Sequence, residues 1–257
     1  MHLMAVLKPF FIQLWWLIPL LIAAGIAKTA WFKGFFGELL VQLSAKFLLD
    51  PKVYQAIHNV TLKTPDGTTQ IDHVFVSRFG VFVVETKNYK GWIFGDENQA
   101  TWTQKIFKTT NQFQNPLRQN FKHIKALESL VNLPSEAFHS VIVFVGGSEF
   151  KTQMPQNVTY AGGYISYIKS KTNPILSASD VEAVYSAIST SRLAPSLATN
   201  REHVKNVRNR LNPDAPRLCP KCGAEMVQRT VKNGDKAGSK IWGCSAFPKC
   251  RMIQNVT

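Results

Sequence analysis

The sequence predicts an α/β fold, because a helical pattern is followed by three short β-type runs, a second helix and a buried strand. An apolar segment precedes this core, and a small module containing cysteines follows it. Of the 257 residues, 45% are hydrophobic and 11% are aromatic, which excludes a disordered or low-complexity protein. The formal net charge of +14 favours a polyanionic partner, either nucleic acid or an anionic membrane surface.

The amino-terminal segment from Pro9 to Ala27 contains no charged residue. As a helix rising 1.5 Å per residue it would span about 28 Å, close to the hydrocarbon thickness of a bilayer. We therefore expect one transmembrane helix within residues 1–30, with membrane lipid as a partner. A cleavable signal peptide and a buried helix are the alternatives, although the apolar stretch is longer than most signal-peptide segments.

The lysines around this segment predict its orientation. Lys8 precedes it, and four lysines follow it: Lys28, Lys33, Lys46 and Lys52. Positive residues stay on the cytoplasmic side. The expected location is therefore the cytoplasmic (inner) membrane, in a single pass, with the C-terminal domains in the cytoplasm.

The core elements follow in order along the chain. Residues 35–49 have apolar positions at helical spacing, and Asp50-Pro51 ends that helix. Strands are expected at 56–64, 70–77 and 81–87, and further strands at 92–94 and 100–107. Asn115-Pro116 begins a second helix, and residues 140–145 are a strand buried on both faces. The apolar face expected for the second helix comprises Leu117, Phe121, Ile124, Leu127 and Leu130.

The region after the core is expected to be helical. Ser179-x-x-Glu182 and Thr199-x-x-Glu202 have the spacing of capping boxes. Two prolines within residues 212–216 indicate a linker. Four units are expected: the transmembrane helix in 1–30, the α/β domain in 31–150, a helical extension and linker in 151–216, and the module with the cysteines in 217–257.

Three charged residues, Asp72, Glu85 and Lys87, lie in otherwise apolar strands. A charge in such a place is costly unless it is paired or used. If Phe79-Gly80 is a two-residue turn, Asp72 lies opposite Lys87, and Glu85 shares their face. A three-residue loop would move Asp72 to the other face.

Two carboxylates on one face suit a hard divalent cation such as Mg²⁺ or Mn²⁺. A neighbouring lysine would then orient or deprotonate a water that attacks a phosphate. The alternative is a cross-strand ion pair that only stabilises the hairpin.

Four ordered segments resemble the NERD (nuclease-related) domain: Gly37-Glu38, QIDH at 70–73, GVFVVETKN at 80–88 and NPLRQN at 115–120. That domain is regarded as a relative of the PD-(D/E)xK nucleases. The resemblance covers about residues 33–150 and implies a restriction-endonuclease-like core (α-β-β-β-α-β) and phosphodiester hydrolysis. It also implies roles for individual residues: Glu38, Asp72 and Glu85 as acids of the metal site, Lys87 as the lysine of the ExK element, and Gln119 as a polar residue facing the site.

The four cysteines form a C-x₂-C pair and a C-x₅-C pair: Cys219, Cys222, Cys244 and Cys250. Four thiolates in this arrangement can close a tetrahedral Zn²⁺ site, and a module of about 40 residues has too small a core to fold well without one. Disulfides are the alternative, which a cytoplasmic location disfavours.

The segment 219–251 resembles the four-cysteine zinc ribbon at the C-terminus of bacterial type I topoisomerases, a ribbon that binds single-stranded DNA. The last 57 residues carry 12 Lys and Arg against 4 Asp and Glu, and therefore a net charge of +8. Base stacking and phosphate neutralisation are expected from Trp242, Phe247, Lys249 and Arg251. The alternative is a purely structural ribbon with a solvated basic face.

Together these observations predict a membrane-anchored, metal-dependent nuclease that hydrolyses phosphodiester bonds in DNA, with the ribbon holding DNA. Water activated by a metal ion held by Asp72 and Glu85 would attack in line, beside Lys87, with Glu38 completing the site. One alternative is a non-catalytic, membrane-tethered protein that binds nucleic acid. Another is an interaction module for other membrane proteins.

Overall fold

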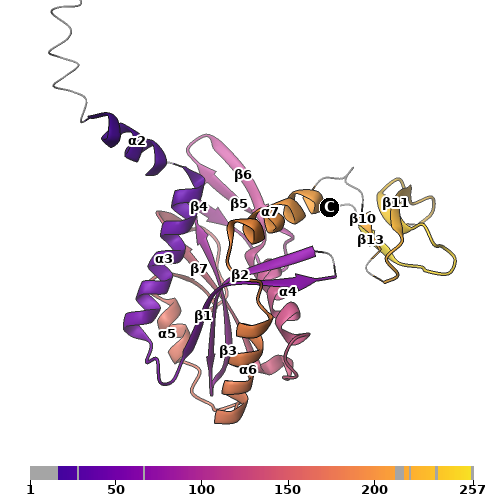
Figure 1. The fold of residues 1–257 in the computed structure, drawn as a ribbon. Coiled ribbons are helices and arrows are strands. Elements are labelled where there is room, and N and C mark those ends of the chain that lie inside the picture. The colour runs from indigo at the N-terminus through magenta and orange to yellow at the C-terminus, as the bar shows by residue number, and fades with distance from the viewer. Residues whose placement is uncertain are drawn as a thin grey trace, which may run out of the picture.

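The main sheet of the protein has five strands, in the order β1-β2-β3-β7-β9 (Figure 1). The computed structural model describes residues 17–27, 29–65, 67–211, 217–219, 221–234 and 237–255. Strands β1 (Gln55–Thr64), β2 (Gly67–Ser77) and β3 (Gly80–Asn88) form an antiparallel meander. Strands β7 (Phe138–Val145) and β9 (Val158–Tyr160) extend it in parallel. The predicted meander and the predicted buried strand are confirmed.

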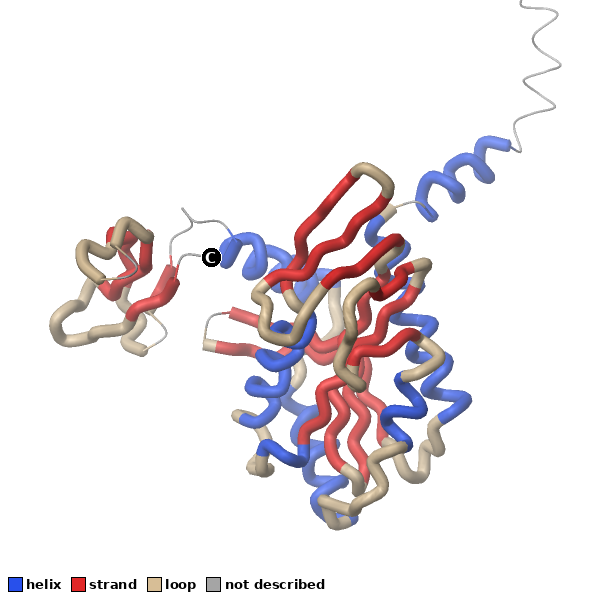
Figure 2. The backbone as a smooth tube through the Cα atoms, turned by 180° about the vertical axis from the view of Figure 1, so that it is seen from behind, coloured by secondary structure: helices blue, strands red, loops and turns tan. Residues whose placement is uncertain are grey.

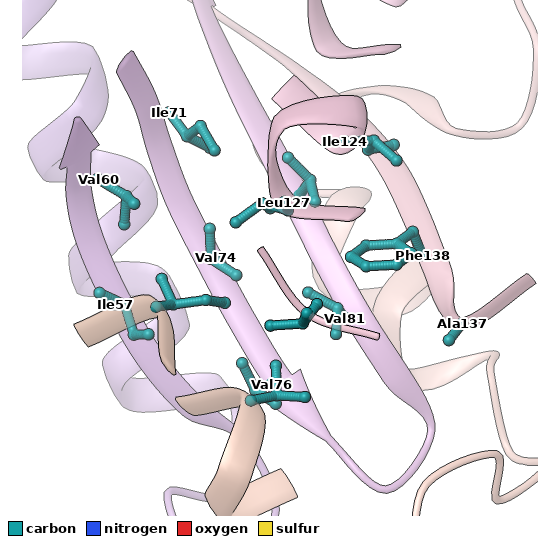
Figure 3. Packing of buried hydrophobic residues seen from close by; sticks show 14 of the residues in the cluster. Ile57, Val60, Ile71, Val74, Val76, Val81, Ile124, Leu127, Ala137 and Phe138 are labelled. Atoms are coloured by element: carbon teal, nitrogen blue, oxygen red, sulfur yellow. The ribbon is translucent and has the colours of Figure 1, made fainter. Parts of the chain in front are cut away.

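Helices cover both faces of this sheet (Figure 2). Helices α3 (Ala30–Leu48) and α5 (Tyr164–Lys169) pack on one face. Helices α4 (Pro116–Glu128) and α6 (Ala178–Ser191) pack on the other. Figure 3 shows the apolar residues buried on the face that α4 and α6 cover, with Leu127 of α4 among Val74 and Val81 of the strands. Burial of this continuous apolar layer positions the helices relative to the strands.

A second sheet, in the order β6-β5-β4-β8, follows directly after β3. It contains β4 (Gly91–Phe94), β5 (Thr101–Ile106), β6 (Thr109–Gln114) and β8 (Ser148–Phe150). Its inner face buries Ile93 and Trp102, and the Trp102 ring stacks on Phe144 of the main sheet. Strand β6 is not predicted by the sequence, because its exposed residues TTNQ have no apolar alternation.

The helices differ from expectation in detail. On α4 the expected apolar residue Phe121 is exposed, whereas Asn120 and His123 are buried. The capping box of α6 uses Ser177 and Asp180, two residues before the predicted one. Helix α7 (Leu197–Leu211) begins two residues before Thr199, whose amide donates to Ser196 Oγ. A short 3₁₀ helix (Ser135–Ala137) precedes β7.

Helix α2 (Leu17–Ala27) is what the structure describes of the expected transmembrane segment, and residues 9–16 lie outside the described part. Its 11 residues span about 16 Å, half the thickness of a bilayer core. Thr29, the N-cap of α3, separates it from the next helix. Within the described residues, no helix combines the length and the apolar character that a membrane crossing requires. The predicted transmembrane helix is therefore wrong, and with it the single-pass inner-membrane location and the membrane-lipid partner.

The C-terminal module is a four-stranded antiparallel sheet in the order β10-β11-β12-β13. Its strands are β10 (Arg217–Leu218), β11 (Glu225–Thr230), β12 (Lys240–Cys244) and β13 (Ile253–Asn255). The small core consists of three of the cysteines together with Met226 and Trp242.

Candidate active site and cysteine cluster

The candidate active site begins at an irregularity between β1 and β2. The two strands pair regularly from Gln55–Val76 to His58–His73 and again from Val60–Ile71 onward. Asn59 faces Asp72 at the unpaired position between them, and its φ of 54° lies in the left-handed region that asparagine tolerates better than most residues. Regular pairing is thus interrupted where Asp72 lies.

The turn between β2 and β3 differs from the expected one, yet it preserves the shared face. Ser77 pairs with Gly80, so the turn is Arg78-Phe79 and the register is shifted by two residues. Continued to Asp72, this register places Glu85, not Lys87, opposite it. A shift of two leaves the paired residues between the turn and His73–Val84 on their expected faces. Pairing between the strands ends at His73–Val84, and beyond it the Thr86 amide donates to Asp72 Oδ2 at 2.7 Å.

Glu85 is the centre of the polar network. Lys87 Nζ donates to Glu85 Oε1 at 2.7 Å and to Gln119 Oε1 at 2.8 Å. The Gln119 amide in turn donates to Glu85 Oε1 at 2.7 Å. His123 Nε2 lies 3.2 Å from the other carboxylate oxygen of Glu85. Strand β3 and helix α4 thus supply a closed triangle of Glu85, Lys87 and Gln119, flanked by His123.

This arrangement separates the acid strengths of the two strand carboxyls. Burial opposes ionisation of Glu85, but Lys87 and His123 overcome that cost and bring the pKa of Glu85 down to about 2. Burial, followed by the negative charges of Glu85 and Glu38, raises the pKa of Asp72 well above its ordinary value. Burial also disfavours the charged form of Lys87, but Glu85 and Asp72 raise its pKa overall, so Lys87 stays a cation.

Glu38 reaches the same region from α3. A Cβ atom at the preceding Gly37 would lie 2.7 Å from Val145 Cγ2, so only glycine lets the helix approach the strand ends this closely. Burial and the charge of Glu85 raise the pKa of Glu38. This electrostatic coupling indicates that Glu38 faces the same region as the strand acids.

A divalent cation fits the charge of this site. When ionised, the three acids and Lys87 carry a net charge of −2. Burial is the main cause of the raised pKa values of Asp72 and Glu38, and the neighbouring carboxylates are the second cause, which a cation would offset. In the described part of the chain, however, only the four cysteines form a group of three or more possible ligands within 4.8 Å of one another. Mg²⁺ usually retains several waters and is held by only one or two protein carboxylates, so it does not require a closed set of protein ligands.

His123, Thr69 and Asn120 complete the site and are not predicted from the sequence. The His123 Nδ1 atom lies 2.7 Å from Thr69 Oγ1, which fixes the ring beside Glu85. Asn120 donates to the Val83 carbonyl at 2.8 Å and so ties α4 to β3. Gln119 and His123 are four residues apart, and that helical spacing is the signal that would have identified the histidine.

The four cysteines converge as their spacing predicts. The Sγ atoms of Cys219 and Cys250 are 3.7 Å apart, and those of Cys222 and Cys244 are 3.4 Å apart. All four ligand atoms lie within 4.8 Å of one another, and no disulfide forms among them. Four convergent thiolates match a structural Zn²⁺ site.

The four residues expected to contact nucleic acid occupy different environments. Phe247, Lys249 and Arg251 are exposed, and Phe247 and Arg251 line a groove of about 250 Å³. The Arg229 guanidinium lies 5.9 Å from the centre of the Phe247 ring. Trp242 is only 5% exposed and packs in the core of the module, so its ring faces are covered.

Comparison with known proteins agrees with this geometry. Residues 33–145 match the family described as nuclease-related domain. An uncharacterized protein of Bacillus anthracis is 40% identical over 184 residues, which cover 69% of this chain and 85% of that relative. The chain belongs to the nuclease-related domain (NERD) family. Residues 216–257 match the topoisomerase DNA-binding C4 zinc finger, and no solved structure matches the chain.

The matched NERD segment contains all the polar residues of the candidate site on α3, β2, β3 and α4. Strand β9 and helices α5 and α6 lie beyond it and nevertheless pack against the main sheet: β9 pairs with β7, and Ile168 of α5 and Ile188 of α6 are buried on its two faces. In this NERD protein, elements outside the matched segment thus pack against the sheet that carries the site. The arrangement offers a fixed cation, Lys87, beside a set of carboxylates, which suits reactions at phosphate.

Proposed function

We propose that this protein is a metal-dependent nuclease that hydrolyses phosphodiester bonds in DNA and holds single-stranded DNA with its zinc ribbon. The observation that carries the proposal is the part-buried triangle of Glu85, Lys87 and Gln119 beside Asp72, at the point where β2 and β3 separate. A hairpin ion pair that served only for stability would not need Gln119, His123 and a second strand acid around it.

Each residue of the site has a proposed role. Asp72 and Glu85 would hold Mg²⁺ or Mn²⁺, with Glu38 completing the acidic set, and a cation held there polarises phosphate oxygens and acidifies bound water. Lys87, a cation in the metal-free site, would orient or deprotonate the attacking water and offset phosphate charge. Gln119 holds the ammonium against Glu85.

Two basic surfaces support DNA as the substrate. The ribbon exposes Phe247, Lys249 and Arg251, of which the aromatic ring would stack on a base and the cations would neutralise phosphates. Trp242 would contribute from the ribbon core by supporting this surface. Helix α7 adds three exposed basic residues at helical spacing: Arg201, Lys205 and Arg208. The opposite side of α7 is held to β2 by contacts of His203 and Asn206 with Thr68 at 3.0 and 3.2 Å.

The test is cleavage of circular and single-stranded DNA by the full chain, with Mg²⁺ or Mn²⁺ and without added divalent cation. Lys87→Ala should reduce metal-dependent cleavage by at least about 100-fold, because the charge next to the reacting phosphate is lost. Lys52→Ala, an exposed lysine in the loop between α3 and β1, is the control and should cut at the rate of the wild type. Equal cutting by Lys87→Ala and wild type would refute the proposed site, and binding without any cutting would indicate a non-catalytic nucleic-acid-binding protein.

Asp72→Asn should separate stability from function. Removing one of three mutually repelling carboxylates should stabilise the metal-free protein by about 1 kcal/mol, or a rise of roughly 2–4 °C in Tm, while the amide oxygen still accepts from Thr86. The same change should abolish cleavage and reduce the rise in Tm that Mg²⁺ produces in the wild type. Thermal denaturation with and without Mg²⁺ measures both effects. A destabilised variant that still responds fully to Mg²⁺ would contradict the assignment of Asp72.

A further inference from the structure

The hairpin of β5 and β6 ends in an unusual turn. Ile106 pairs with Thr109, so Phe107 and Lys108 alone form the turn. Phe107 has a φ of 51° and is 94% exposed. A bulky residue in the left-handed region is strained, and glycine or asparagine is the ordinary choice there. Folding of the described chain therefore gains nothing from a phenylalanine at this position.

The surface around this turn is basic and aromatic. The hairpin segment 101–114 contains Lys105 and Lys108 and no acidic residue. Lys105 pairs with Trp92, an exposed aromatic residue on β4, and Lys151 Nζ lies 4.8 Å from the centre of the Trp92 ring. Glu149 on the neighbouring strand β8 is neutralised by Lys151 at 2.6 Å, and the exposed acids Asp96 and Glu97 lie in the β4–β5 loop, at the end of β5 away from the turn. Positive charge interleaved with aromatic rings complements a nucleic-acid strand.

The hairpin is linked to the candidate active site through α4, which follows β6, and through β4, which pairs with β5. Strand β4 begins four residues after Lys87, and β6 leads through Asn115 into α4, which carries Gln119. The side-chain amide of Asn115 donates to the backbone carbonyls of Asp96, Glu97 and Gln99 at 2.8–3.2 Å. These bonds fix the junction between β6 and α4. The Tyr89 ring packs on Phe113 of β6, with 4.5 Å between the ring centres. Figure 2 shows the hairpin projecting from this anchored base.

We propose that Phe107 stacks on an unpaired base of the DNA strand that occupies the active site, while Lys105 and Lys108 neutralise neighbouring phosphates. The proposal rests on the proposed function for its choice of DNA as the ligand. The strained turn holds the ring out in water, where a base would cover it. The hairpin thus provides a second contact to the strand, separate from the zinc ribbon.

The experiment measures equilibrium binding of a fluorescent 15-nucleotide dT strand and of a matched abasic strand to the full chain carrying Lys87→Ala, without added divalent cation. Phe107→Ala should weaken binding to dT about tenfold, the usual scale for losing one stacked base, and should not change binding to the abasic strand. Phe107→Tyr should bind within about twofold of the parent. Phe107→Gly should bind as weakly as Phe107→Ala and yet melt at a higher temperature, because glycine adopts this φ without strain.

Two controls make the result specific. Phe47→Ala removes another ring, 78% exposed on α3, and should leave binding unchanged. In a chain that already carries Phe247→Ala, Phe107→Ala should weaken dT binding by the same factor as in the parent, because the hairpin contact is independent of the ribbon. Binding of Phe107→Ala within twofold of the parent, or an equal loss on the abasic strand, would overturn the proposal. A lower molecular mass of Phe107→Ala in light scattering would overturn it in favour of self-association. The binding experiment uses the Lys87→Ala parent and therefore does not depend on cleavage. Failure of the nuclease proposal would appear only in the cleavage assay, and the binding result would still test the role of Phe107.

Discussion

Replacing Cys219 with serine is expected to release the zinc ion and unfold the C-terminal ribbon. Zinc binding supplies an apparent 10–16 kcal/mol to modules of this kind, whereas the ribbon core has few apolar side chains besides the cysteines, mainly Met226 and Trp242. Metal analysis should show one zinc per wild-type chain and none in the variant. Trp242 is the ribbon's one tryptophan, so its exposure should shift tryptophan emission to longer wavelength.

Ser245→Ala is the matched control for the ribbon, because Ser245 is exposed next to Cys244 and is not a ligand. It should retain one zinc ion and the emission of the wild type. The emission shift should vanish when Trp242 is also replaced by phenylalanine, which identifies its source. Retention of a full zinc equivalent by Cys219→Ser would contradict the four-cysteine site.

Replacing Glu85 with alanine is expected to have the largest effect in the candidate active site. The Glu85 and Lys87 side chains are only 5% and 16% exposed, so the change leaves a buried cation without its carboxylate. Breaking such a buried pair costs about 3–5 kcal/mol of unfolding free energy. Urea denaturation should report this loss, and metal-dependent cleavage should disappear.

The double variant Glu85→Ala/Lys87→Ala tests the reason for that loss. It should be more stable than Glu85→Ala alone, because the unpaired charge is gone. The surface pair of Glu149 and Lys151 is the comparison, since Glu149→Ala should cost less than about 1 kcal/mol. A double variant whose loss equals the sum of the two single losses would show that Glu85 and Lys87 are not energetically coupled.

The sequence predicts the central strands and the shared face of Glu85 and Lys87 for a simple reason, whereas Gln119 was expected at the site only from the resemblance to the NERD domain. Strand side chains alternate with a period of two, so the unexpected turn at Arg78-Phe79 shifts the register without changing the face. The partner of Asp72 was not predictable, because it depends on which two residues occupy the turn. The cysteine spacing predicts the cluster directly, since metal ligation tolerates few arrangements.

The errors have physical causes. Hydrophobic periodicity assigns Phe121 to the buried face of α4, yet the site requires Asn120 and His123 there, and their partners Val83 and Glu85 lie nearly 40 residues away. Apolar length alone predicts a membrane helix from Pro9 to Ala27. It gives no indication that Thr29 would cap a new helix, α3, soon after α2.

The interruption at Asn59 and Asp72 has a consequence for engineering. Ile57 and Val60 both reach the core, as do Val74 and Ile71, so the inside-outside alternation shifts by one residue in both strands at this step. A stability-guided redesign would treat Asn59 as a defect and favour a β-branched residue that restores the missing pair. Such a repair would draw the backbone of Asp72 into regular pairing with β1 and move its carboxylate from the position that it holds in the site. Thermostabilised variants of this protein should therefore leave this pair unchanged, since the irregularity and the acidic residue occupy the same step of the hairpin.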